Sequence, residues 1–169
     1  MDLCAYMPSA STTPSSKPEA FVYVEDIMTK DIVKISAEKS IQEVAKIMAE
    51  RNISSVLVED IGKIIGILTE RDLVRNVCAK DVLASKTPAV SIMSAPVATV
   101  SKNSRIEIAA DLMIKEKVRH LAVEDNYGNV IGIITTTDLA RYLRRRLPST
   151  DLEILEAIYA YDEPYATAL

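Results

Sequence analysis

The residues best suited to chemistry lie at one predicted strand-to-helix junction. Residues 132–143 read GIITTTDLARYL, an aliphatic strand running into a helix, with Thr135, Thr137 and Asp138 at the turn. A helix N-terminus offers unpaired backbone N–H groups and a positive dipole end, which favour a phosphate. A carboxylate repels phosphate but can accept hydrogen bonds from both hydroxyls of a ribose. Threonine and aspartate on one turn therefore suit a ribose phosphate.

The same turn also has a purely structural interpretation. Thr-x-x-Asp before an apolar run is a capping box, in which the threonine accepts a helix N–H and the aspartate reaches back. Capping and ligand binding are compatible, because the same side chains can cap the helix when the site is empty. The rest of the sequence must decide how much weight each interpretation receives.

The junction is repeated because the chain contains two copies of one unit. Residues 27 onward align with residues 92 onward, with one residue inserted at Tyr127. DIMTKDIVKIS then matches SIMSAPVATVS, and GKIIGILTERDL matches GNVIGIITTTDL. Apolar positions pair with apolar positions throughout, as in a true internal repeat. In the first copy, Thr69 and Asp72 repeat the threonine–aspartate pair.

Each unit predicts an extended stretch, a helix, two strands and a final helix. The extended residues 33–35 and 97–100 precede helices with apolar residues at i, i+3, i+4 and i+7. Ser40 with Glu43, and Ser104 with Glu107, are expected to cap these helices. Strands are predicted at 54–58, 64–68, 119–123 and 130–134. The fold class is α/β (α+β), with two β-α-β-β-α units. Such small units are marginal alone, so we expect them to pack across a pseudo-twofold axis.

The composition predicts a packed core and indicates where the tails lie. Its 169 residues are 49% hydrophobic, enough for a packed core. Residues 1–20, rich in Ser, Thr, Pro and Ala, are expected to form a flexible tail. We expect the first unit at 21–80, the second at 88–147 and a short amphipathic helix or tail at 148–169.

Several functional classes are disfavoured. The net charge of −4 argues against a general nucleic-acid binder. No apolar run is long enough to span a membrane, and no secretory signal is evident. Cys4 and Cys78 are isolated, which suggests neither a disulfide framework nor a metal site and fits a cytoplasmic protein. With one histidine and no nucleotide-hydrolysis or nucleophile motif, the chain is not expected to be an enzyme.

Three pairs of motifs, taken in order, resemble tandem cystathionine-β-synthase-type (CBS) domains, the arrangement called a Bateman module. They are DIMT and SIMS, ISSVLV and VRHLAV, and GILTERDL and GIITTTDL, over roughly residues 24–147. The resemblance implies a non-catalytic regulator. Its ligand would be an adenine nucleotide (AMP, ADP or ATP) or a related adenosyl compound such as S-adenosylmethionine, bound in clefts between paired domains. It also implies a homodimer that signals to an effector protein of unknown identity.

The resemblance further implies that basic residues on the central strand contact phosphate. In the second copy these are Arg119 and His120, which strand alternation should direct to opposite faces. His120 is the only histidine, so a pH effect on binding near 6 to 7 would implicate it. Val97, at the start of the second extended stretch, is also included among the ligand-binding residues.

The first copy is expected to bind anions less well. Ser54 and Ser55 stand where the second copy has Arg119 and His120. Arg71 compensates if it turns inward and is otherwise a solvent-facing helix residue. We therefore expect two unequal clefts, with the better phosphate site on the second copy.

Two alternative functions stay open. One is a protein-interaction or assembly module with vestigial clefts. The other is a nucleic-acid-associated regulator that uses the arginine-rich residues 141–146. The structural interpretation of these arginines is that cations at a helix C-terminus offset the helix dipole.

Overall fold

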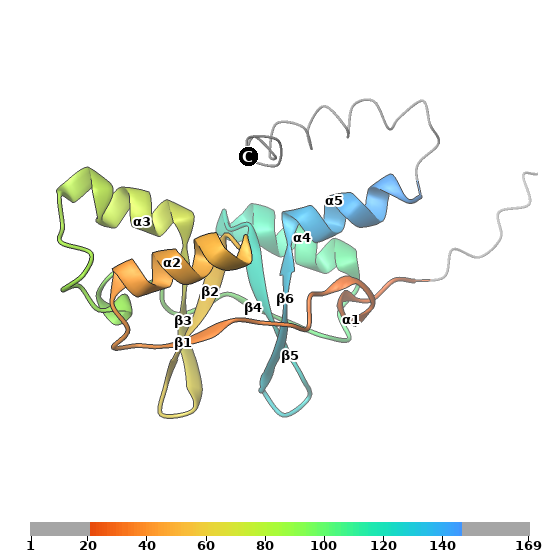
Figure 1. Cartoon of the computed structure of the whole chain (residues 1–169). Helices are drawn as coiled ribbons and strands as arrows, with labels where there is room; N and C mark the ends of the chain where they lie inside the picture. The colour runs from red at the N-terminus through yellow and green to blue at the C-terminus, as the bar shows by residue number, and fades with distance from the viewer. Residues whose placement is uncertain (1–20, 147–169) are drawn as a thin grey trace, which may run out of the picture.

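The computed structural model describes residues 21–146, which form two repeats of helices over a three-stranded sheet (Figure 1). The first repeat contains α1 (Val24–Ile27), β1 (Lys34–Ser36), α2 (Ile41–Arg51), β2 (Ser55–Asp60), β3 (Lys63–Thr69) and α3 (Glu70–Asn76). Two short 3-10 helices follow, η1 (Cys78–Lys80) and η2 (Ala89–Ser91). The second repeat contains β4 (Thr99–Ser101), α4 (Ile106–Glu116), β5 (His120–Glu124), β6 (Val130–Thr135) and α5 (Thr136–Arg144).

This order confirms the predicted repeat of two β-α-β-β-α units. The expected N-terminal tail at 1–20 and the whole expected C-terminal segment at 148–169 lie outside the described residues, and so does Leu147. Among residues 21–146, no helix combines the length and apolar character needed to cross a membrane.

The two sheets have the same topology. Their strand orders are β1-β2-β3 and β4-β5-β6, with the first pair of strands parallel and the second pair antiparallel in each sheet. In the antiparallel pairs Ser55 faces Thr69 and His120 faces Thr135. The start of each central strand therefore adjoins the threonine that begins the final helix. Both β-hairpins project from the same side of the molecule (Figure 1).

The helix cap predictions hold in one repeat and fail in the other. The Ser40 hydroxyl accepts from the Glu43 backbone N–H at 3.4 Å, and the Glu43 carboxylate accepts from the Ser40 N–H at 3.2 Å. This confirms the first capping box. The second prediction is wrong, because α4 has Arg105 as its N-cap residue and makes no side-chain cap. Ser104 lies one residue too early.

The repeats are held together through a small core between the sheets. Leu57 and Ile67 from the first sheet pack with Ala122 from the second. Val97 and Ile133 are among the partly buried residues around them. Each repeat also has its own larger core beneath its helices. The two sheets thus pack against each other as the predicted pseudo-twofold arrangement requires.

The segment before each repeat reaches across to the other repeat. We call residues 24–33 the first arm and residues 89–98 the second arm. Thr29, in the first arm, exchanges two backbone hydrogen bonds of 2.9 Å with Ile133 of β6. Ser94, in the second arm, exchanges bonds of 2.8 and 3.0 Å with Ile67 of β3. Each arm therefore adds a short bridge to the sheet of the opposite repeat.

Glycines make this close approach possible. A Cβ atom on Gly132 would lie 2.9 Å from the Thr29 carbonyl oxygen, and one on Gly66 would lie 2.9 Å from that of Ser94. A real Cβ atom does not approach a backbone oxygen so closely. The glycine in GILT and in GIIT is thus required where the arm crosses the strand.

Candidate functional site: two clefts between the repeats

Two clefts of similar volume lie between the repeats. The first, of about 280 Å³, is lined by the first arm, the start of β2 and the first turn of α5, and we call it the Asp138 cleft. The second, of about 310 Å³, is lined by the second arm, the start of β5 and α3, and we call it the Asp72 cleft. Both volumes are close to the lower limit for small-molecule sites in proteins.

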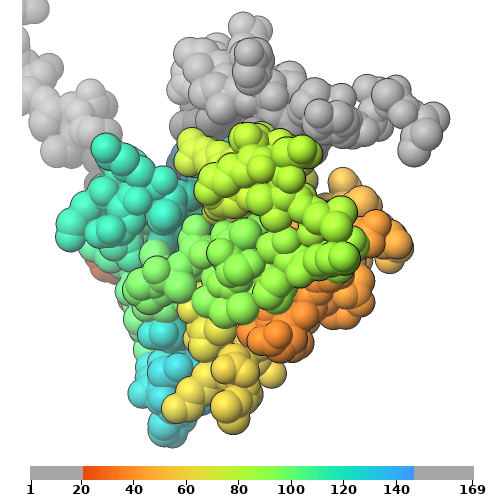
Figure 2. Space-filling view, turned by 90° about the vertical axis from the view of Figure 1, so that its left-hand side faces the viewer, coloured from red at the N-terminus to blue at the C-terminus, as the bar shows by residue number. Residues whose placement is uncertain are grey.

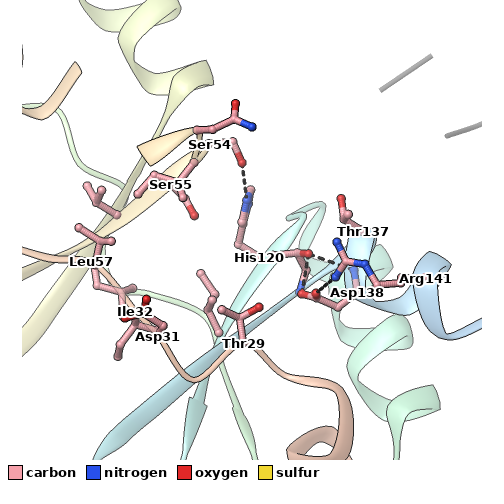
Figure 3. A pocket seen from close by; sticks show the side chains of 16 residues that line it. Thr29, Asp31, Ile32, Ser54, Ser55, Leu57, His120, Thr137, Asp138 and Arg141 are labelled. Carbon is pink, nitrogen blue, oxygen red and sulfur yellow. Dashed lines mark hydrogen bonds and ion pairs between the residues drawn. The ribbon is translucent and has the colours of Figure 1, made fainter. Parts of the chain in front are cut away.

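Each cleft combines residues of both repeats. In the Asp138 cleft, Thr137 and Asp138 from the second repeat lie opposite Ser54 and Ser55 from the first (Figure 3). Thr135 of the second repeat lines the same cleft. The sequence does not show this grouping, because it depends on how the two sheets face each other. A side chain that leaves the central strand toward the interface meets the helix junction of the other repeat.

The expected phosphate site on the second copy therefore needs a correction. Arg119 does not line the Asp138 cleft but lines the Asp72 cleft, with Thr69, Arg71 and Asp72. His120 lines both clefts, whereas Arg119 lines the Asp72 cleft alone. Arg119 directly precedes β5, which begins at His120.

Asp138 caps its helix and also forms part of the cleft wall. Its side chain is only 6% exposed. One carboxylate oxygen accepts from the Thr135 N–H at 2.9 Å and from the Thr135 hydroxyl at 2.7 Å, while the other accepts from Arg141 at 3.0 Å. The Asp138 N–H donates to the Thr135 hydroxyl at 3.2 Å. The structural interpretation of this turn is thus confirmed, and it places a buried carboxylate at the cleft.

Asp72 repeats this arrangement in the first copy. One of its oxygens accepts from the Thr69 N–H at 2.8 Å and from the Thr69 hydroxyl at 2.6 Å. The other accepts from the Ser94 hydroxyl, on the second arm, at 3.2 Å. The two aspartates thus differ in one partner, which is an arginine for Asp138 and a serine for Asp72.

His120 is shared by both clefts. It also lines a smaller hollow of about 170 Å³, together with Arg119 and residues 135–137. Its Nε2 atom lies 3.4 Å from the Ser54 hydroxyl (Figure 3). A single imidazole therefore contacts both candidate binding sites.

The surroundings of His120 hold the imidazole neutral. Burial lowers its pKa to about 4, the nearby cations of Arg119 and Arg71 act in the same direction, and Asp138 and Asp72 oppose them. The pKa is this low because a charged imidazole would lose its hydration and lie beside two guanidinium groups. It lies below the range of pH 6 to 7 in which a pH effect on ligand binding would implicate His120, and that effect stays a prediction.

Two arginines of the site were not predicted as ligand-binding residues. Arg141 lines the Asp138 cleft and Arg75 lines the Asp72 cleft. The repeat contains their signal, since DLVR and DLAR place an arginine three residues after each aspartate. In the second copy that arginine begins the run considered as a partner-binding or helix-end feature.

Of the remaining residues predicted to bind ligand, one lines a cleft and one does not. Arg71 lines the Asp72 cleft but is also exposed to solvent, so both of its alternatives stay open. Val97 lines neither cleft and belongs to the core between the sheets. Thr29 and Ser94, on the arms, line the two clefts and were missed. Only the structure brings the arms next to the opposite repeat.

The fold and the paired clefts define a tandem-repeat module with two related cavities between its halves. The chain belongs to the CBS domain family, which matches residues 24–79 and 89–145. It is 35% identical to the uncharacterized protein MK0525 of Methanopyrus kandleri, over 70% of this chain and 61% of that protein. It is 32% identical to the CBS domain-containing protein YhcV of Bacillus subtilis, over 69% of this chain and 82% of that protein.

A solved structure shares the fold and contains ligands. The CBS domain pair of protein MJ0100 was determined in complex with 5′-methylthioadenosine and S-adenosyl-L-methionine. It aligns with a TM-score of 0.69 and 29% identity, covering 76% of this chain and all of that one. The chain spans less than two thirds of the length of MK0525, so the activity of such longer relatives does not transfer directly.

Proposed function

We propose that this CBS pair is a non-catalytic regulatory module that binds adenosyl ligands in its two clefts and signals to a partner protein. The ligands are adenine nucleotides such as AMP, ADP or ATP, or an adenosyl compound such as S-adenosylmethionine. The exposed free thiol of Cys78 is compatible with a reducing compartment, and we place the module in the cytoplasm.

The repeated threonine–aspartate turn at the wall of each cleft carries the proposal. Asp138 and Asp72 present carboxylates that can accept hydrogen bonds from the two hydroxyls of a ribose. Each is already oriented by the N–H and hydroxyl of its threonine, so little side-chain entropy is lost when ligand binds. The adenosyl ligands of the MJ0100 domain pair support the same ligand class here.

Thermal-shift and calorimetric titration with four compounds test this function. The compounds are AMP, ATP, 5′-methylthioadenosine and S-adenosylmethionine, with cytidine nucleotides as controls. A ligand that binds only the folded protein raises its melting temperature by mass action. We expect at least one adenosyl compound to do so at concentrations where cytidine nucleotides do not. No shift and no heat with any of the four at millimolar concentration would refute the proposal.

A homodimer is the assembly that the surface supports. Large apolar side chains are exposed on three helices: Val74 on α3, Ile108 and Ile114 on α4, and Leu143 on α5. Ile114 is the most exposed of these four residues, at 76%. Light scattering should give the mass of two chains, and a monomer at high micromolar concentration would contradict this.

A further inference from the structure

We infer that the two clefts sort adenosyl ligands by charge. The Asp72 cleft takes a phosphate-bearing adenine nucleotide, and the Asp138 cleft takes an adenosyl ligand without phosphate, either a neutral nucleoside thioether or a sulfonium cation. This inference rests on the proposed function and assigns a ligand class to each cleft.

Both clefts keep one common frame. Thr135 and Asp138 in one cleft correspond to Thr69 and Asp72 in the other, by the alignment of the repeats. The arginine three residues later is also common to both. The features suited to a ribose are therefore present twice, and they do not distinguish the two clefts.

The lining positions that differ in charge change in one electrostatic direction. Four pairs of equivalent positions that line both clefts differ in charge, and in each pair the Asp72 cleft has the more positive or less negative residue. Given with the Asp138-cleft member first, they are Asp31 and Pro96, Asn52 and Lys117, Ser54 and Arg119, and Thr137 and Arg71.

The resulting charges are opposite. Four cationic side chains line the Asp72 cleft (Arg71, Arg75, Lys117 and Arg119), against the carboxylates of Asp72 and Glu116. The Asp138 cleft has Arg141 against the carboxylates of Asp31 and Asp138. Figure 2 shows the face of the molecule on which α3 and the following loop lie beside α4, the elements that border the Asp72 cleft.

The arginines also differ in their availability. Arg141 is bound to Asp138 at 3.0 Å, so a phosphate in that cleft would have to compete with a carboxylate for it. Within residues 21–146, no ion pair or hydrogen bond engages the guanidinium groups of Arg71 and Arg75. A guanidinium binds phosphate through paired N–H donors, and this geometry is open to both residues.

These differences decide which ligand each cleft prefers. A terminal phosphate carries about −1.5 to −2 charges near neutral pH, and its polyphosphate forms carry more. Salt screens only in part the interaction between charges closer than the Debye length of about 10 Å, which applies to a ligand and the side chains that line the same cleft. The Asp72 cleft therefore attracts a nucleotide, whereas Asp31 and Asp138 repel it and attract a sulfonium.

The test uses two probes and paired variants. Calorimetric titration measures the binding of ATP and of 5′-methylthioadenosine to the full chain. Each compound is titrated alone and again in the presence of a saturating concentration of the other. The variant Arg71→Thr/Arg119→Ser gives the Asp72 cleft the residues found at the equivalent positions of the Asp138 cleft. The control Lys63→Thr/Lys86→Ser removes the same number of positive charges from exposed residues that line neither cleft.

We expect ATP and 5′-methylthioadenosine to bind together without competing. Arg71→Thr/Arg119→Ser should weaken ATP binding by roughly a hundredfold, about tenfold for each guanidinium, and leave the thioether affinity within twofold. The control variant should change neither affinity by more than about threefold. Asp138→Asn should show the converse pattern, with weaker thioether binding and unchanged ATP binding.

The possible outcomes distinguish failure of the charge assignment from failure of the proposed adenosyl-binding function. If neither probe binds the wild-type chain, the charge assignment fails, and if AMP and S-adenosylmethionine do not bind either, the proposed function fails with it. If both probes bind but compete for one cleft, the assignment alone is overturned. The same holds if Arg71→Thr/Arg119→Ser weakens both probes equally or affects ATP no more than the control does.

Discussion

The contact between each arm and the opposite repeat can be tested with one methyl group. Gly132→Ala would place a Cβ atom 2.7 Å from the Met28 sulfur and 2.9 Å from the Thr29 carbonyl oxygen. The methionine can change rotamer, but the carbonyl belongs to the backbone and cannot. The first arm must therefore move away from β6, or the strand must deform.

The loss of stability can be estimated from the steric clash and from the hydrogen bonds that are lost when the arm moves. Overpacking a filled site costs about 1–3 kcal/mol. Withdrawal of the arm would lose the two 2.9 Å hydrogen bonds between Thr29 and Ile133, each worth about 1 kcal/mol. Because relief of the clash and loss of the bonds are partly alternatives, we expect Gly132→Ala to lower the free energy of unfolding by about 2–4 kcal/mol.

Urea unfolding followed by circular dichroism measures this change, read from the midpoint at constant slope. Gly66→Ala should behave alike, since its Cβ atom would lie 2.6 Å from the Met93 sulfur and 2.9 Å from the Ser94 carbonyl oxygen. Gly128→Ala is the control: its φ is +80° but no atom lies within 4 Å, so only a backbone penalty of about 1 kcal/mol applies. If Gly132→Ala is no more destabilising than Gly128→Ala, the reasoning about arm contact is wrong.

Three further predictions concern the site and the caps. Asp138→Asn should weaken 5′-methylthioadenosine binding by roughly ten- to a hundredfold and affect its 2′-deoxy analogue much less; equal losses in calorimetry would exclude a ribose contact. Ser40→Ala should cost about 1 kcal/mol in urea unfolding, and Ser104→Ala close to nothing, because Arg105 is the N-cap of α4. His120 has its pKa lowered from 6.5 to about 4, so the unfolded chain takes up a proton first and stability falls as the pH drops through this window. Wild type should lose about 2 kcal/mol more than His120→Gln between pH 7 and 5, and parallel pH profiles would contradict the neutral imidazole.

The order of the elements could be predicted from the sequence because its signals are local. Apolar residues at helical spacing predicted helices where α2 and α4 lie, and aliphatic runs predicted β3 and β6 to within one residue at each end. The Thr135–Asp138 turn was predicted because a capping box needs only four residues. The repeat reinforced each of these predictions, since every element is encoded twice.

The composition of each cleft could not be predicted in the same way. Ser54 and Arg119 occupy equivalent positions, but each meets the helix junction of the other repeat. No local pattern states which junction faces which strand, because this depends on the packing of Leu57, Ile67 and Ala122 between the sheets. The lowered pKa of His120 has the same origin, since burial between the repeats is its main cause.

The two repeats agree and differ in physically distinct places. Gly66 and Gly132 are the same residue because an arm carbonyl leaves no room for a side chain at either position. The threonine–aspartate turns are the same because each must cap a helix. Around the clefts this constraint is absent: Ser54 and Arg119 face cavities, so neither packing nor capping fixes their type. Identities between the repeats therefore report the fold and the part of the ligand that both clefts are proposed to share. Differences that gather at a cavity and change charge in one direction report what the cavity binds.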